Sequence, residues 1–201
     1  MKAYPSINGK IVHRPIVAFD KLDGSNVRAE WSRKRGWYKF GKRNHLLDDA
    51  DPFLQEAKGL IVERYGDSLP KIFRDQRLDN AVSFFEFFGP NSFAGYHVDE
   101  PHETVLIDVS ASKGIYEPRE YLRLFKHLKI AEPLYSGNPN SHLTEAVQDG
   151  TLEGMTFEGV VCKGLWTSPG LPLMFKIKNR AWIERVKARY ADNPALVESL
   201  L

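Results

Sequence analysis

The stretch Lys21-Leu22-Asp23-Gly24-Ser25-Asn26 determines how the rest of this chain is interpreted. It places an amine, a carboxylate, a glycine that permits a tight turn and an amide close together, a set suited to attack by a lysine on a nucleotide phosphate. A lysine is protonated at neutral pH, so such a site must lower its pKa by burial or by neighbouring cations. The alternative is a hairpin turn that carries a solvated lysine.

The pattern predicts strands on both sides of this stretch and helices farther along. Residues 16–20 and 26–31 indicate two strands joined by residues 21–25, and the second strand alternates as a half-buried strand does. Further strands are predicted at residues 37–40, 81–88, 103–109, 156–163 and 172–178. Helices are predicted at residues 52–65, 117–128, 142–148 and 181–190. This order indicates an α+β fold with a largely antiparallel sheet.

The composition predicts one globular domain. The 201 residues are 42% hydrophobic and 12% aromatic, which suffices for one well-filled core. No repeat or low-complexity linker divides the chain, and too few residues follow the strand at 172–178 for a second domain. We therefore expect a single domain over residues 1–201 with a basic helix at about residues 181–190.

Positive charge is clustered rather than abundant. The 28 Lys and Arg residues against 26 Asp and Glu residues give a net charge of only +2. Cations nevertheless crowd residues 28–43 and 176–189. Such clusters can form a phosphate-binding face. The alternative is a solvated hairpin and an ordinary polar helix face.

The chain shows no sign of export. Cys162 is the single cysteine, which excludes an internal disulfide and disfavours a secreted scaffold. The dispersed histidines disfavour a structural zinc site. The amino-terminal residues lack the apolar run of a signal peptide, and no stretch approaches the length of a membrane span. We expect a soluble, intracellular protein of the cytoplasm without membrane contact; a bacterial or phage source would fit.

A second informative stretch is Phe84-Phe85-Glu86-Phe87-Phe88-Gly89-Pro90, in which a carboxylate interrupts a run of phenylalanines. Glutamate is seldom buried without a partner. If the aromatic residues fill both faces of a central strand, Glu86 would meet a polar ligand group such as a ribose hydroxyl. The alternative is an edge strand with Glu86 directed outward.

A third stretch, Phe157-Glu158-Gly159-Val160-Val161-Cys162-Lys163, carries a second isolated acid. Side chains alternate across a strand, so Glu158 and Lys163 would face opposite sides unless the strand bends, which Gly159 permits. Glu158 could hold a divalent cation through oxygen, the ligand that Mg²⁺ prefers. Lys163 could reach a nucleotide. The alternative is a strand with charged ends.

A fourth stretch, Met174-Phe175-Lys176-Ile177-Lys178-Asn179, places two lysines on one strand face. Two ammonium groups directed at one spot repel each other unless an anion lies between them, which indicates phosphate binding. Their field should also lower the pKa of Lys21. The alternative is an exposed strand face.

In this order, the stretches resemble the motifs of the covalent nucleotidyltransferase superfamily of polynucleotide ligases and capping enzymes. The resemblance is closest to the RNA ligase 2-like, nick-sealing branch of ATP-dependent RNA ligases. Residues 21–26 resemble motif I, 41–44 motif Ia, 84–89 motif III, 105–109 motif IIIa, 158–163 motif IV and 176–179 motif V. The resemblance covers about residues 4–180. It implies a nucleotidyltransferase (ATP-grasp-like) domain with antiparallel sheets flanked by helices and no OB domain.

The resemblance implies an adenylylation. Lys21 would attack the α-phosphate of ATP, release pyrophosphate and keep AMP as a lysyl phosphoramide. Glu158 would hold the catalytic Mg²⁺ or Mn²⁺. AMP would then pass to a 5′-phosphate end, and a 3′-hydroxyl would displace it. The partner would be RNA, or a duplex that contains RNA, with those two ends.

The resemblance also implies the remaining roles. The catalytic set would be Lys21, Asp23, Asn26, Lys176 and Lys178. The nucleotide-binding set would be Asp20, Lys21, Arg43, Glu86, Ile107, Lys163, Lys176 and Lys178. Within it Glu86 would contact the ribose, Asp20 the adenine amino group, and Arg43 the ribose or a substrate phosphate. Ile107 stands where the family often has an aromatic residue, so stacking on the purine would be aliphatic.

One departure concerns the carboxy-terminal module, an OB fold or a helical unit, that many relatives carry. A protein partner could replace it, and the basic helix could do so in part. The alternatives to an RNA ligase are a DNA ligase, a GTP-using capping enzyme, or a non-catalytic module of the same fold that binds RNA ends. Plain binding would not require the nucleophile, which argues against the last. The pathway, RNA repair among others, is left open.

Overall fold

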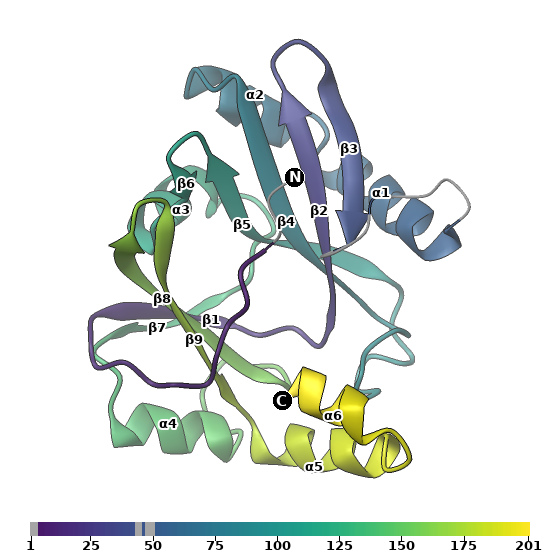
Figure 1. The fold of residues 1–201 in the computed structure, drawn as a ribbon, viewed down its shortest axis with the longest axis vertical. Helices are drawn as coiled ribbons and strands as arrows, with labels where there is room; N and C mark the ends of the chain where they lie inside the picture. Colours follow the sequence, from purple (N-terminus) through teal and green to yellow (C-terminus); the bar gives the residue numbers. More distant parts are fainter. Residues whose placement is uncertain (1–3, 43–45, 47–50) are drawn as a thin grey trace.

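The computed structural model describes residues 4–42, 46 and 51–201. Its framework is two antiparallel sheets, the five-stranded sheet drawn above the four-stranded one in Figure 1. The four-stranded sheet has the order β7 (Pro133–Gly137), β1 (Ile16–Asp20), β8 (Gly159–Ser168) and β9 (Leu171–Lys178). The five-stranded sheet has the order β3 (Gly36–Lys42), β2 (Gly24–Ser32), β4 (Asn80–Phe88), β5 (Glu103–Ala111) and β6 (Gly114–Ile115).

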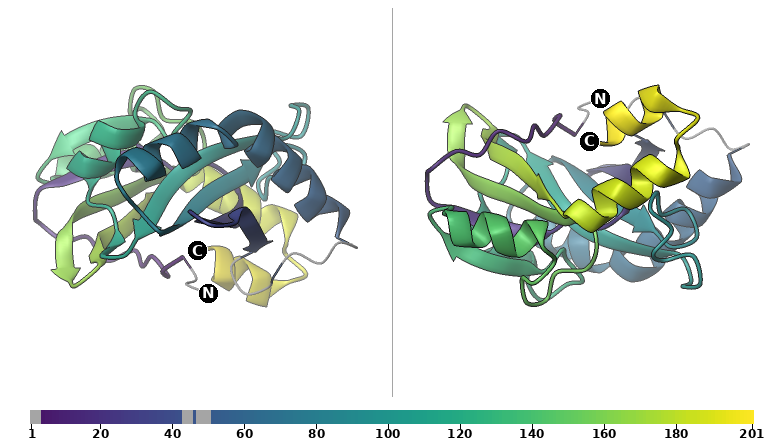
Figure 2. Two further views of the ribbon diagram at one scale, coloured as in Figure 1. Left: turned by 90° about the horizontal axis from the view of Figure 1, so that it is seen from above. Right: turned by 90° about the horizontal axis from the view of Figure 1, so that it is seen from below.

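Helices cover the outer faces of both sheets. Figure 2 shows α1 (Pro52–Tyr65) and α2 (Ser68–Asp75) over the five-stranded sheet from above, and α4 (Ser141–Gln148) and α5 (Arg180–Arg189) beneath the four-stranded sheet. The larger core joins α1, α2 and α3 (Pro118–Phe125) to the phenylalanines of β4. A smaller core joins α4 to β1, β8 and β9. The inner faces of the two sheets therefore face each other. No helix in the described part of the chain is long and apolar enough to cross a membrane.

The Lys21 stretch does not form a hairpin. β1 lies in the four-stranded sheet and β2 in the five-stranded sheet, so residues 21–23 carry the chain from one sheet to the other. The hairpin alternative is therefore wrong. The lysine follows directly after the buried end of β1, where Asp20 and Phe19 are almost inaccessible to solvent. This crossing point places the Lys21 side chain between the sheets.

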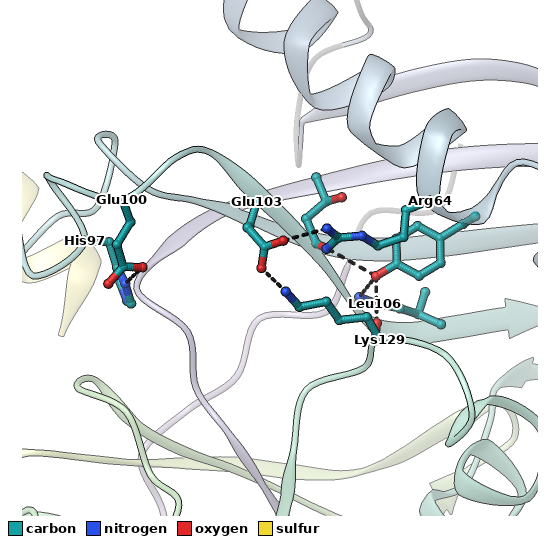
Figure 3. Close-up of polar contacts among 8 residues, drawn as sticks. Arg64, His97, Glu100, Glu103, Leu106 and Lys129 are labelled. Carbon is teal, nitrogen blue, oxygen red and sulfur yellow. Dashed lines mark hydrogen bonds and ion pairs between the residues drawn. The ribbon is translucent and has the colours of Figure 1, made fainter.

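Polar contacts fix the end of α1 to the five-stranded sheet. Glu103 accepts a hydrogen bond from Arg64 at 2.6 Å and also pairs with Lys129 (Figure 3). The buried hydroxyl of Tyr65 donates to the Lys129 carbonyl and accepts from the Leu106 amide. Burial raises the pKa of Tyr65 to about 12, so this hydroxyl keeps its proton. The network orders the start of β5 from its outer side.

Most predicted elements are present close to their predicted positions, and the α+β class is confirmed. The pattern missed β6, β7, α2 and α6 (Pro194–Leu200). α2 contains Pro70, which an interior helix position would not tolerate but the first turn does. β7 begins with Pro133 and ends with Gly137, and it lies at a sheet edge where proline is tolerated. These proline and glycine residues explain why the sequence pattern predicted neither α2 nor β7.

Candidate functional site

A cavity of about 250 Å³ lies between the inner faces of the two sheets. The four-stranded sheet contributes Phe19, Val161, Lys163, Lys176 and Lys178, and the five-stranded sheet contributes Gly24, Asn26, Glu86 and Ile107. Lys21 and Glu158 line it from the connections just outside the strands. The amino-terminal residues 4–7 and two residues of α6, Ser199 and Leu200, close further sides. Residues from all four predicted motif stretches thus meet in one cavity.

Glu158 joins two lysines at one end of the cavity. Its Oε1 lies 2.7 Å from the Nζ of Lys21 and 2.5 Å from the Nζ of Lys178. The side chain of Lys21 is 23% exposed, whereas those of Glu158 and Lys178 are 5% and 7% exposed. Lys178 also lies over the ring of Trp182, with its nitrogen 3.9 Å from the ring centre. Lys21 is therefore the most exposed member of the group, and all three line the cavity.

Gly159 explains how Glu158 and Lys163 face one cavity. Gly159 has a φ of +133°, and a Cβ at this position would lie 2.1 Å from the Ile177 carbonyl oxygen. This conformation is one that only glycine adopts readily. It turns the chain just before β8, so that Glu158 and Lys163 both line the cavity. The bend expected from the sequence is present.

The charges at this end change the pKa values in an unexpected direction. Burial alone would lower the pKa of Lys21, but the carboxylates of Glu158 and Glu86 outweigh it and raise the pKa. The expectation that the pKa of Lys21 would be lowered is therefore wrong, because the attraction of the carboxylates outweighs burial. The lysine whose pKa falls is Lys178, to about 8, mainly through burial and against the attraction of Glu158. Burial also raises the pKa of Glu86 to about 8.

Glu86 and Asn26 stand opposite each other on neighbouring strands. β4 is the central strand of its sheet, so the edge-strand alternative for Glu86 is wrong. Asn26 pairs in register with Glu86, and both line the cavity. Within the described residues, the buried Oδ1 of Asn26 has no hydrogen-bond partner. The pair therefore offers polar groups to a ligand at one position in the cavity.

Lys163 forms the other end of the cavity. Its ammonium donates to the Asp108 carboxylate at 2.8 Å and to the Ile107 carbonyl at 2.7 Å. Both partners of the ion pair are almost completely buried, at 3% and 1% exposed. Asp108 also accepts a hydrogen bond from the Tyr4 hydroxyl. The register between β4 and β5 shifts at this point, which leaves Ile107 as the extra residue of a bulge, and Ile107 lines the cavity.

The two aspartates of the first motif are tied to the backbone. Asp20 lines the cavity and accepts hydrogen bonds from the Thr156 amide at 3.0 Å and the Thr156 hydroxyl at 2.9 Å; its contact with adenine stays a prediction. Asp23 is fully buried, does not line the cavity, and accepts from the amides of Phe93 and Ala94. The structure shows it holding the backbone of residues 93–94, and its catalytic role stays a prediction. Arg43 lies outside the described residues.

The sequence interpretation missed Asp108, the partner of Lys163, and several residues of the cavity wall. Asp108 carries the signal that identified Glu86, an acid inside an apolar strand, and could have been found by it. Residues 4–7, Phe93, Ser199 and Leu200 line the cavity with no polar motif to mark them. Their positions depend on how the chain ends fold back over the sheets, which periodicity does not encode.

The donor groups of the cavity fit a hard divalent cation that a ligand helps to hold. The described part of the chain has no cluster of three or more His, Cys, Asp or Glu side chains that could hold a metal alone. Mg²⁺ is usually bound by one or two carboxylates together with waters and substrate phosphates. Glu158, with Glu86 also lining the cavity, supplies such carboxylates.

Solved RNA ligase structures share this fold. An RNA ligase of Naegleria gruberi with PPi aligns with a TM-score of 0.64 and 17% identity over 88% of this chain and 53% of that chain. A mutant of that ligase with ATP and Mn aligns at 0.63 and 15% over 90% and 59%. An archaeal ATP-dependent RNA ligase aligns at 0.64 and 17% over 94% and 50%. This chain therefore spans about half to three fifths of those proteins. No protein-family model and no curated protein sequence matches it.

Proposed function

We propose that this chain carries the adenylylation step of an ATP-dependent RNA ligase, with Lys21 as the acceptor of AMP. The observation that carries the proposal is the cluster of Lys21, Lys178 and Glu158 at one end of a cavity that Lys176 also lines. The shared fold with RNA ligases supports the same class of reaction.

The residues of the cavity can perform the transfer as follows. The Lys21 ammonium, whose side chain is 23% exposed, releases its proton to solvent water, and the amine attacks the α-phosphorus of ATP. The P–N bond forms as the bond to the bridging oxygen breaks, and pyrophosphate leaves with that electron pair. Lys176 and Lys178 compensate the charge that builds up on the phosphate oxygens. Glu86 and Asn26 are placed to accept and donate hydrogen bonds at the sugar.

A divalent cation on Glu158, when bound, supplies compensating charge to the phosphates and removes the carboxylate charge that raises the Lys21 pKa. The protein alone holds Lys21 as a paired ammonium, which is unreactive. We therefore expect covalent labelling to depend on Mg²⁺ or Mn²⁺ as well as on ATP.

The test is covalent labelling. The protein is incubated with ATP labelled at the α-phosphate and with Mg²⁺ or Mn²⁺, and then separated by denaturing electrophoresis. Label should remain on the parent protein and be absent from Lys21→Ala, while Lys126→Ala, an exposed lysine at the end of α3, should label normally. Equal labelling of Lys21→Ala would refute the assignment.

The substrate is tested separately. α-Labelled GTP and adenylate-labelled NAD distinguish a capping enzyme and an NAD-using ligase from an ATP-dependent one. Sealing of nicks with RNA or DNA on the 3′ side then distinguishes RNA from DNA ligation. The second candidate, a module that only binds RNA ends, is favoured by the raised pKa of Lys21 and predicts RNA binding without any label.

A further inference from the structure

Asp23 couples the nucleophile segment to a loop that forms the rim of the cavity. Its two oxygens accept from the amides of Phe93 at 3.0 Å and Ala94 at 2.8 Å. Phe93 itself lines the cavity together with Lys21. Because Asp23 is fully buried, these charge-assisted bonds fix the loop firmly relative to Lys21.

Two arginines of α5 lie on this loop. The Nε of Arg185 donates to the Ala94 carbonyl at 2.7 Å, and its guanidinium lies over the Tyr96 ring at 4.2 Å from the centre. Arg189 is one helical turn farther on the same face. A Cβ at Gly95, where φ is +72°, would lie 1.9 Å from its Nη1, so the loop needs glycine to let this guanidinium approach.

Tyr96 and Phe157 stack beside the Arg185 guanidinium. Tyr96 stacks on Phe157 with ring centres 4.5 Å apart and an angle of 9° between the planes. Arg185, Tyr96 and Phe157 therefore form a column of planar groups. Phe157 directly precedes Glu158, so the column ends beside the group that joins Lys21 and Lys178.

The outer side of this column remains open and positive. Arg185 and Arg189 are both exposed, and the hydrogen bond to Ala94 uses only one N–H donor of Arg185. A planar guanidinium binds phosphate through two parallel N–H groups and also stacks on bases. Two such groups one turn apart, next to the cavity, match the phosphates of a polynucleotide strand in charge and in geometry.

We propose that Arg185 and Arg189, presented by loop residues 93–96, form the docking surface for the single-stranded end of an RNA substrate. The inference rests on the proposed function for the identity of the substrate. Docking there would bring an RNA end to the rim of the cavity beside Lys21. Asp23 would hold the loop, and with it the docking surface, in a fixed position relative to Lys21.

The test compares Arg185→Gln, Arg189→Gln and the double variant with Arg180→Gln. Arg180 belongs to the same helix and is exposed, but it is bound to Asp149 at the other end. Two measurements are made: covalent labelling with ATP, and binding of a short 5′-phosphorylated single-stranded oligoribonucleotide over a range of salt concentrations. The double variant should bind the RNA about tenfold to a hundredfold more weakly. The slope of log affinity against log salt concentration should become shallower by about 0.7 for each phosphate that the arginines no longer neutralise.

The outcomes separate this inference from the proposed function. Normal labelling with weaker RNA binding in the double variant, but not in Arg180→Gln, supports it. Unchanged affinity and salt dependence overturn it, and so does reduced labelling with unchanged RNA binding, since the arginines would then serve ATP. If the parent protein takes no label but its RNA binding still depends on the arginines, the docking surface stands and the proposed function fails.

Discussion

The two ends of the cavity treat their cations differently. At one end, called the sealed end below, Lys163 forms an ion pair with one carboxylate, Asp108, and both side chains are buried. At the other end, called the open end below, Lys21 and Lys178 share a single oxygen of Glu158. Glu86, with a pKa of about 8, is mostly protonated there at neutral pH. In the first pair one ammonium is balanced by one carboxylate, and the pair joins the two sheets. The second has more positive charge than its acids balance, which is the condition for binding an anion.

The largest expected effect concerns the sealed end. Asp108→Asn leaves the Lys163 ammonium buried without a counter-charge, so the free energy of unfolding should fall by about 3–5 kcal/mol. Urea unfolding followed by circular dichroism measures this. Asp149→Asn removes the exposed partner of Arg180 and should cost no more than about 1 kcal/mol. Equal losses in the two variants would mean that the Lys163 pair does not join the sheets.

The next effect concerns the open end. Glu158→Gln removes the charge that joins Lys21 and Lys178 and the candidate ligand for a cation, so covalent labelling should fall by about 10²–10³-fold. Glu132→Gln changes an exposed glutamate beside β7 and should label normally. Labelling is measured at a temperature where circular dichroism shows each variant folded. Labelling of Glu158→Gln at the parent rate would show that this carboxylate has no part in the reaction.

The contrast between the ends could be predicted from the sequence only in part. The order of strands and helices followed from periodicity, and the isolated acids and paired lysines marked the open end. At the sealed end the sequence assigned Lys163 to the nucleotide, which stays a prediction, and did not indicate its ion pair with Asp108. Its partner, Asp108, follows Ile107, the extra residue of a bulge, and a regular alternation of two residues does not include that extra residue.

The direction of the Lys21 pKa illustrates a second limit. Strand periodicity correctly placed Lys176 and Lys178 on one face, and both line the cavity. It gave no distance between Lys21 and Glu158, which come from distant parts of the chain and lie 2.7 Å apart. Coulomb energies depend on such distances and on burial, so the sign of a pKa shift requires the folded geometry.

A smaller effect is expected at Gly159, whose turn lets Glu158 and Lys163 line the same cavity. Gly159→Ala places a Cβ against the Ile177 carbonyl at a φ that alanine avoids, so stability should fall by about 1–3 kcal/mol from backbone strain. Gly9→Ala meets no atom within 4 Å and should leave stability almost unchanged. Thermal unfolding of the two variants measures the difference. A neutral Gly159→Ala would show that the turn tolerates other conformations.

The last expected effect is a pH dependence of stability that belongs to the open end. Glu86 has a pKa of about 8 in the folded protein and an ordinary value of 4.5. Between these values the folded state keeps a proton that the unfolded state has lost, so stability is complete below pH 4.5 and falls as pH rises towards 8. For Lys178, with a folded pKa of about 8 against 10.5, the unfolded state holds the extra proton above pH 8, and stability rises with pH.

These two groups together predict a stability minimum near pH 8. Glu86→Gln should remove the falling limb, with a difference in slope from the parent of up to about 1.4 kcal/mol per pH unit. Urea unfolding at a series of pH values measures it, and Glu145→Gln, an exposed acid of α4, is the control. If Glu86→Gln and the parent run parallel between pH 5 and 8, Glu86 is charged in the folded protein. The open end would then lack the excess positive charge that distinguishes it from the Lys163 end.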